Sequence, residues 1–188
     1  LLRPFDAFDL VKNLKESLSI PIHMQTHATT GMSTATNMKA IEAGIDNIDT
    51  SISSLSMTYG HTATETMLAI FEGQNREINL DLNALEEVSS FFKEIREKYS
   101  EFEGSLKGVD SSMLVKQVPG GMLSNLESQL KANRQEDKID LVKEEIPKVR
   151  KDFGYPPLVT PASQIVGAQA LLNVMNSRRY ENLSNESI

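Results

Sequence analysis

Three polar side chains alternate along one short stretch of the sequence, at His23, Gln25 and His27. Apolar residues stand between them, and this alternation over residues 20–27 predicts a strand. Residues two apart on a strand point to the same face, so the three side chains would line up about 6.5 Å apart. One metal ion could then bind an imidazole nitrogen of His27 and a weaker, uncharged amide oxygen of Gln25. The alternative is three polar residues at the solvated end of a strand, with no metal.

A hydroxyl-rich segment, residues 51–65, follows a second predicted strand at residues 45–52. Loops that follow parallel strands are where α/β enzymes place their active sites, and His61 could act there as a ligand or a base. The alternative is the plain start of a helix, in which Thr62 caps the first turn and Glu65 completes a capping box.

A third candidate lies where an extended stretch meets a helix, at Thr160 and Pro161. Proline suits the first position of a helix, which places Ser163 and Gln164 in the first turn. Free N–H groups there favour carbonyl or anionic ligands, and a threonine hydroxyl can pass a proton because it both donates and accepts. The alternative is that Thr160 only caps the helix.

Apolar spacing predicts the elements that must position these residues. In the first half, helices and strands alternate at 9–18, 20–27, 32–43, 45–52, 61–71 and 83–99. Such alternation indicates parallel strands covered by helices, an α/β architecture. Two parallel strands have no stability alone, so we expect neighbouring strands from residues outside this chain.

Beyond Gly104 the pattern is helical only, at 122–133, 137–153 and 161–175. Pro147 must either kink the second of these helices or begin a new one. We place a domain boundary between Gly104 and Gly108.

The amino-acid composition and net charge of the chain exclude some classes of function. The chain has 188 residues, with 19 Lys and Arg against 26 Asp and Glu, which gives a net charge of −7. This balance argues against nucleic acid as a partner. There is no cysteine, so disulfides and thiolate metal sites are excluded. No apolar run approaches the roughly 20 residues of a membrane span.

Three stretches, residues 27–66, 106–130 and 155–175, resemble the carboxyltransferase domain of biotin-dependent enzymes. The resemblance is greatest to the oxaloacetate decarboxylase alpha chain. It is nearly as great to the carboxyltransferase subunit of two-subunit pyruvate carboxylases, and more distant to the large subunit of transcarboxylase. It implies the C-terminal part of a TIM (β/α)8 barrel at residues 1–105, followed by a helical extension at 106–188 that closes the barrel mouth. We therefore expect a partial domain, with the remaining strands, a metal-binding lysine, a metal-binding aspartate and a biotin-carrier domain outside it.

The resemblance also implies site residues. The family's two metal histidines fall on Gln25 and His27, so this sequence departs from the pattern at Gln25. His23 is not a family ligand. The implied cofactors are a divalent metal ion of the Zn, Co or Mn type and biotin on its separate carrier domain. The family's catalytic threonine falls on Thr160.

The residues implied to contact biotin are Ser163 and Gln164. The implied reaction moves a carboxyl group from oxaloacetate to biotin and leaves pyruvate. One alternative is the carboxyltransferase subunit of a pyruvate carboxylase, which carboxylates pyruvate; another is a non-catalytic fragment that acts as an interaction module. The implied full enzyme is a cytoplasmic homodimer, which membrane subunits can join.

Overall fold

Helices make up most of the computed structural model, which describes residues 2–74 and 78–187. The chain forms two compact units, Leu2–Asp110 and Ser111–Ile188. The division follows Asp110, a few residues beyond the stretch between Gly104 and Gly108 where the sequence places a boundary.

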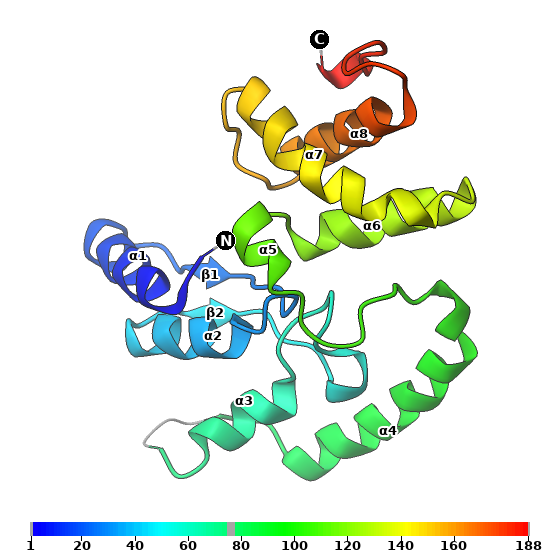
Figure 1. Cartoon of the computed structure of the whole chain (residues 1–188). Helices are drawn as coiled ribbons and strands as arrows, with labels where there is room; N and C mark the ends of the chain where they lie inside the picture. Colours follow the sequence, from blue (N-terminus) through cyan, green and yellow to red (C-terminus); the bar gives the residue numbers. More distant parts are fainter. Residues whose placement is uncertain (1, 75–77, 188) are drawn as a thin grey trace. The chain divides into compact units, whose positions relative to one another are not determined.

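The first unit alternates helices and strands in the predicted order and ends in a long helix (Figure 1). Its elements are α1 (Pro4–Ser17), β1 (His23–Met24), α2 (Ser33–Glu42), β2 (Asn47–Ile48), η1 (Ser53–Leu55), α3 (Thr64–Phe71), α4 (Leu82–Lys98) and η2 (Ser100–Phe102). Strands β1 and β2 pair in parallel, with His23 opposite Asn47 and Met24 opposite Ile48. The predicted parallel pairing is confirmed.

Both strands are much shorter than predicted, at two residues each. A residue enters a sheet only where a neighbouring strand bonds to it, and within the described residues β1 and β2 have only each other. The backbone continues in contact beyond them: the Asp49 N–H donates to the Met24 carbonyl at 3.0 Å, and Ser51 forms an isolated parallel bridge with Ala63. The described chain is therefore mostly helical with little sheet, which corrects the expected α/β layers.

Helix α1 begins at Pro4, earlier than the predicted start at Asp9, because proline fits the first turn of a helix. It packs on α2, where the two helices bury small side chains that allow close approach. Ala7 and Ala40 are fully buried, and Val11 is almost so.

Helix α3 begins at Thr64, later than predicted, because the bridge to Ser51 holds the Ala63 backbone extended. The predicted capping box is wrong, since no side chain caps this helix. The Glu65 carboxylate instead accepts the Ser53 N–H at 2.9 Å. Thr62 is fully buried and lies before the helix rather than at its cap.

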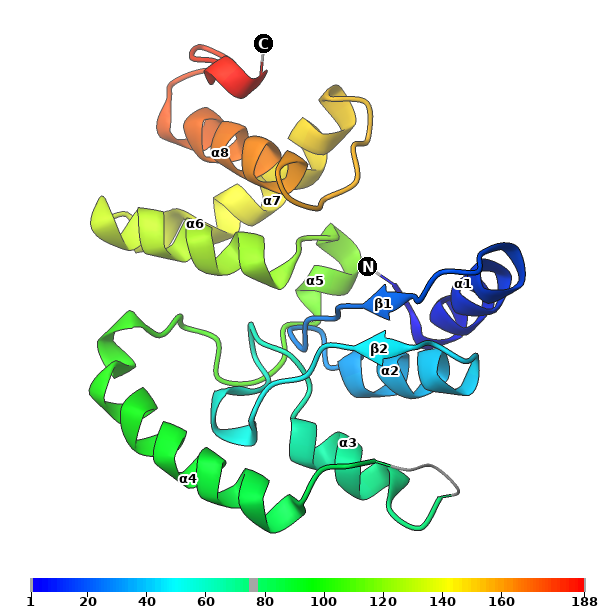
Figure 2. The same ribbon diagram turned by 180° about the vertical axis from the view of Figure 1, so that it is seen from behind.

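The second unit has helices and no strand among its described residues, as predicted (Figure 2). Its elements are α5 (Ser112–Lys116), α6 (Gly120–Ala132), η3 (Glu136–Lys138), α7 (Ile139–Asp152), α8 (Ala162–Met175) and η4 (Asn185–Ser187). Pro147 lies inside α7, so it does not begin a new helix. The core is formed by apolar side chains of α5 to α8: Met113, Leu123, Leu126, Leu130, Val142, Ile146, Val149, Val166 and Ala170.

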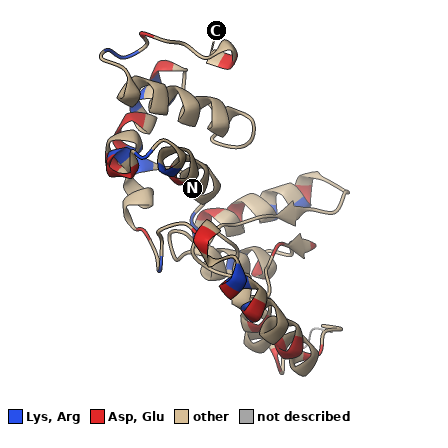
Figure 3. Cartoon of the chain, turned by 90° about the vertical axis from the view of Figure 1, so that its right-hand side faces the viewer, with Lys and Arg blue, Asp and Glu red and all other residues tan. Residues whose placement is uncertain are grey.

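Residues of both charges occur along the helices (Figure 3). No helix in the described ranges is long and apolar enough to cross a membrane.

A buried carboxylate, Glu145, ties α7 to α8 and to the segment that follows. It is 5% exposed, and it accepts hydrogen bonds from Asn173 at 3.0 Å, from Arg179, and from Lys148 at 3.2 Å. Burial acts to raise the pKa of Glu145, but these bonds outweigh burial, and the net effect lowers that pKa below its ordinary value of 4.5. The folded second unit therefore favours the charged form.

The neighbouring carboxylate, Asp152, completes this link. It accepts the Tyr180 hydroxyl at 2.6 Å and an Arg179 N–H at 2.8 Å, and both bonds lower the pKa of Asp152. Burial, together with the bond to Asp152, raises the pKa of Tyr180 to about 12. The segment after α8 is thus held to α7, which steadies the helix that carries Ser163 and Gln164.

Removing the Glu145 charge should destabilise the second unit in a pH-dependent way. Because its folded pKa is lowered, the contribution is complete above the unfolded value and is lost as the pH falls through the folded value. We expect Glu145→Gln to cost about 2 kcal/mol of unfolding free energy at neutral pH, and this cost to shrink as the pH falls below the ordinary carboxyl pKa of 4.5. Urea unfolding at several pH values measures this. Glu144→Gln, at an exposed position of the same helix, is the control; an equal effect there, or no pH dependence, would refute the assignment.

Candidate active site

The three alternating polar residues separate into two groups at the carboxyl end of β1. His23 pairs with Asp49, which follows β2, with 2.6 Å between Nε2 and Oδ1. Gln25 and His27, both exposed, lie instead beside His61. The structure therefore brings together the two positions implied to bind metal and leaves His23 apart from them.

His27 is oriented by a single backbone contact. Its Nδ1 lies 2.6 Å from the Tyr59 carbonyl oxygen. A carbonyl can only accept, so Nδ1 carries the hydrogen and the neutral ring keeps its lone pair on Nε2. Metal-binding histidines are commonly fixed in this way, by a hydrogen bond from the ring nitrogen that does not bind the metal.

His61 is fixed in the same way from the other side. Its Nδ1 lies 2.7 Å from the Thr26 carbonyl oxygen, which leaves Nε2 as the acceptor. That Nε2 is 3.5 Å from the Gln25 side-chain nitrogen, and the His61 ring centroid is 5.0 Å from that of His27. The sequence identifies His61 as a possible ligand or base, but it does not place this residue beside Gln25 and His27. The contacts of His27 with the Tyr59 carbonyl and of His61 with the Thr26 carbonyl join two segments that are more than 30 residues apart in the sequence. No local sequence pattern predicts that these segments meet.

Residues 59–62, the segment that contains His61, are held in place by hydrogen bonds of hydroxyl and backbone groups and by a tight turn at Gly60. The Thr62 oxygen lies 2.7 Å from the Ser33 hydroxyl at the start of α2. The Ala28 N–H donates to the Gly60 carbonyl at 2.8 Å. A Cβ on Gly60 would stand 3.1 Å from the Leu55 carbonyl oxygen, so a side chain does not fit there without a shift of the backbone.

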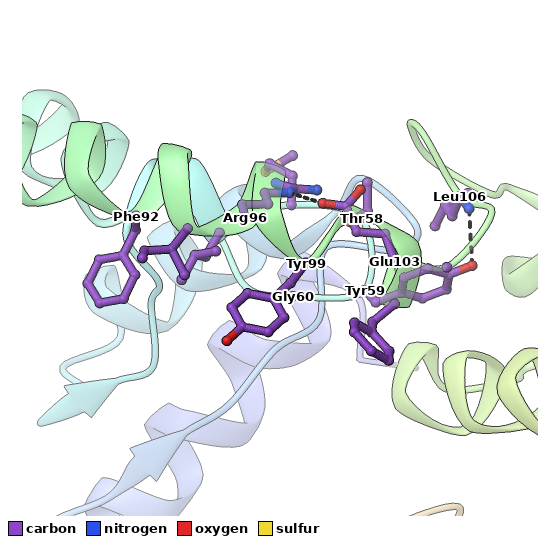
Figure 4. Close-up of a pocket in the computed structure, with 13 residues that line it drawn as sticks. Thr58, Tyr59, Gly60, Phe92, Arg96, Tyr99, Glu103 and Leu106 are labelled. Atoms are coloured by element: carbon purple, nitrogen blue, oxygen red, sulfur yellow. Dashed lines mark hydrogen bonds and ion pairs between the residues drawn. The ribbon is translucent and has the colours of Figure 1, made fainter.

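A pocket of about 430 Å³ lies between residues 57–60 and α4 (Figure 4). Figure 4 shows Tyr59, Tyr99 and Phe92 on its walls, with Arg96 directed toward Glu103. The Tyr59 hydroxyl accepts the Leu106 N–H at 3.2 Å. The pocket wall thus fixes the residue whose carbonyl orients His27.

The side chains near His27 fit a divalent metal only in part. No group of three or more His, Asp or Glu side chains suited to a metal exists among residues 2–74 and 78–187. His27 nevertheless presents an unprotonated Nε2 with its opposite nitrogen anchored, which is the arrangement that Zn or Co uses. A complete site therefore needs further ligands from elsewhere.

Thr160 ends the loop before α8 and is exposed. The first residue outside α8 is Pro161, and no side chain caps the helix, so the capping alternative for Thr160 is wrong. Within the described residues, no hydrogen bond occupies the Thr160 hydroxyl, which is therefore available to a substrate. Ser163 is 7% exposed and Gln164 is exposed, so the two residues implied to contact biotin differ in access.

Two family models match successive parts of the chain. Residues 1–92 match the HMGL-like family, and residues 113–188 match a conserved carboxylase domain. The chain is 48% identical to a pyruvate carboxylase subunit of Methanocaldococcus jannaschii, over 100% of this chain and 33% of that protein. It is 47% identical to the methylmalonyl-CoA carboxyltransferase 5S subunit of Propionibacterium freudenreichii subsp. shermanii, over 99% of this chain and 37% of that protein.

Comparison with solved structures gives the same result as comparison with sequences. The carboxyl transferase domain from Rhizobium etli pyruvate carboxylase with pyruvate matches at a TM-score of 0.91 and 29% identity, over 100% of this chain and 33% of that one. The same domain with pyruvate and biocytin matches at 0.88 and 32%, over 95% of this chain and 30% of that one. The chain thus spans about a third of the length of these relatives. The predicted resemblance to the carboxyltransferase domain of biotin-dependent enzymes is thus confirmed, and this chain corresponds to one segment of those longer proteins.

Proposed function

We propose that the chain forms part of a carboxyltransferase that moves a carboxyl group between oxaloacetate and biotin held on a carrier domain. In this proposal residues 1–105 are the last strands and helices of a TIM barrel, and residues 106–188 close over its mouth. The HMGL-like match and the parallel pairing of β1 with β2 support the barrel assignment.

The observation that carries this proposal is the orientation of His27. Its anchored imidazole stands after the carboxyl end of a parallel strand, where α/β enzymes place their sites, with Nε2 ready to bind a metal. A bound divalent metal would supply positive charge beside the keto oxygen of oxaloacetate, and biotin would accept the carboxyl group.

The chain's own residues then have separate tasks. His27 and Gln25 would hold the metal from one side. Thr160 passes a proton between biotin N1 and the enolate carbon of pyruvate, because its hydroxyl both donates and accepts. Gln164, which is exposed in the first turn of α8, and Ser163, which is 7% exposed in the same turn, contact biotin.

A second candidate is the same path in reverse, pyruvate carboxylation. The name of the Methanocaldococcus jannaschii relative and the pyruvate in the Rhizobium etli structures favour it. The two directions are compared in the protein that carries this chain, by measuring pyruvate formed from oxaloacetate with biotin as the carboxyl acceptor, and oxaloacetate formed from pyruvate with carboxylated biotin as the donor. We expect both reactions to depend on biotin, with oxaloacetate decarboxylation the faster. Absence of both would support the non-catalytic alternative.

A further inference from the structure

The contact between His61 and Gln25 suggests a metal ligand that the family pattern does not include. This inference rests on the metal site proposed above and concerns how that site is completed at Gln25. Both His27 and His61 donate Nδ1–H to backbone carbonyls, at 2.6 and 2.7 Å. Each neutral ring therefore has its only lone pair on Nε2, which is the nitrogen that can bind a metal.

The spacing of the two rings fits one shared ion. A metal bound at about 2.1 Å from each nitrogen, at an angle between octahedral and tetrahedral, requires ring centroids about 4.6–5.3 Å apart. The centroids of His27 and His61 are 5.0 Å apart. The two ring planes are inclined by 37° to each other.

Gln25 lies next to the second of these nitrogens. Its side-chain nitrogen is 3.5 Å from Nε2 of His61. A metal ion bound near the Gln25 amide would therefore also lie near Nε2 of His61. An imidazole is a better ligand than an amide for Zn or Co, so the metal would prefer His61 to Gln25.

We infer that His61 is a metal ligand, and that its imidazole takes the place of the one that position 25 lacks. The site then has two imidazole nitrogens, from His27 and His61, with the Gln25 amide beside them. The remaining ligands are water or groups from outside this segment. His23 takes no part, since Asp49 already pairs with its Nε2 at 2.6 Å.

The chain contains only three histidines, which permits a direct test. Long-range ¹H–¹⁵N spectra of the full protein that carries this chain would resolve the rings of His23, His27 and His61, assigned by single substitutions. Without metal, His27 and His61 should both show the Nδ1–H tautomer. On titration with Zn²⁺ alone, the Nε2 signals of both should shift together, and those of His23 should stay in place.

Variants provide a second measurement of Zn²⁺ affinity, by calorimetry. His61→Ala should weaken binding by at least about tenfold, because losing a ligand costs no less than losing its supporting partner. His23→Ala, the matched control, should change it by less than about twofold. Adding Gln25→His to His61→Ala should restore binding, because the imidazole returns to the same region.

Two results would overturn the inference in distinguishable ways. If Zn²⁺ shifts the His27 signals but leaves those of His61 unmoved, His61 is not a ligand, while the metal site of the proposed function stands. If neither ring responds and no Zn²⁺ binds, both the inference and the metal site fail. The wild-type spectra give this answer even where a variant does not fold.

Discussion

Replacing Thr160 by alanine should slow carboxyl transfer to biotin by about 10²–10⁴-fold, the usual contribution of a positioned proton-transfer group. Thr160 is exposed, does not cap α8, and has no hydrogen-bond partner in the part of the chain that the structure describes. Its loss should therefore leave the fold and the metal content unchanged. Transfer is measured as pyruvate released from oxaloacetate in the presence of biocytin.

Thr160→Ser is the matched control, because it keeps the hydroxyl and removes only a methyl group. It should retain most of the activity. Full transfer by Thr160→Ala would refute the proton role. Equal losses in both variants would show that the methyl group, rather than the hydroxyl, is what the site needs.

Replacing His27 by alanine should weaken metal binding by about 100-fold or more and lower metal-dependent turnover with it. Its Nδ1 is anchored to the Tyr59 carbonyl at 2.6 Å, and no other imidazole among the described residues takes that position. Loss of a supporting partner costs a metal site about 10–100-fold in affinity, so loss of His27 itself should cost about 100-fold or more. Metal content after dialysis and Co²⁺ absorption spectra measure the effect.

His23→Ala again serves as the comparison, since this residue is on the same strand and is held by Asp49. It should keep its metal. If His27→Ala binds metal as tightly as the unchanged protein, His27 is not a ligand, and the site lies elsewhere.

The local parts of this structure could be predicted from the sequence. The order of helices and strands, the parallel direction of β1 and β2, and the helix after Pro161 depend on spacing and on proline, which act within a few residues. The length of the strands could not be predicted, because it depends on neighbours that pair with them.

The site was only half predictable for the same reason. His27 and Gln25 share one strand end, and their alternation is visible in the sequence. His61 reaches them through its bond to the Thr26 carbonyl, 35 residues away along the chain. The bridge between Ser51 and Ala63 likewise joins residues that are distant in the sequence. It explains why α3 begins later than predicted and lacks the predicted cap. These hydrogen bonds and this bridge join residues far apart in the sequence. A capping box is recognised from four consecutive residues only, so it cannot predict them.

The most direct test of the proposed function is the biotin dependence of oxaloacetate decarboxylation by the protein that carries this chain. Pyruvate release is followed with and without added biocytin, in a form of the protein that carries no biotin of its own, for the unchanged sequence and for Thr160→Ala. We predict that biocytin accelerates release and that Thr160→Ala loses this acceleration. Release at the same rate without biocytin, or acceleration that persists in Thr160→Ala, would contradict a carboxyltransferase site built on Thr160.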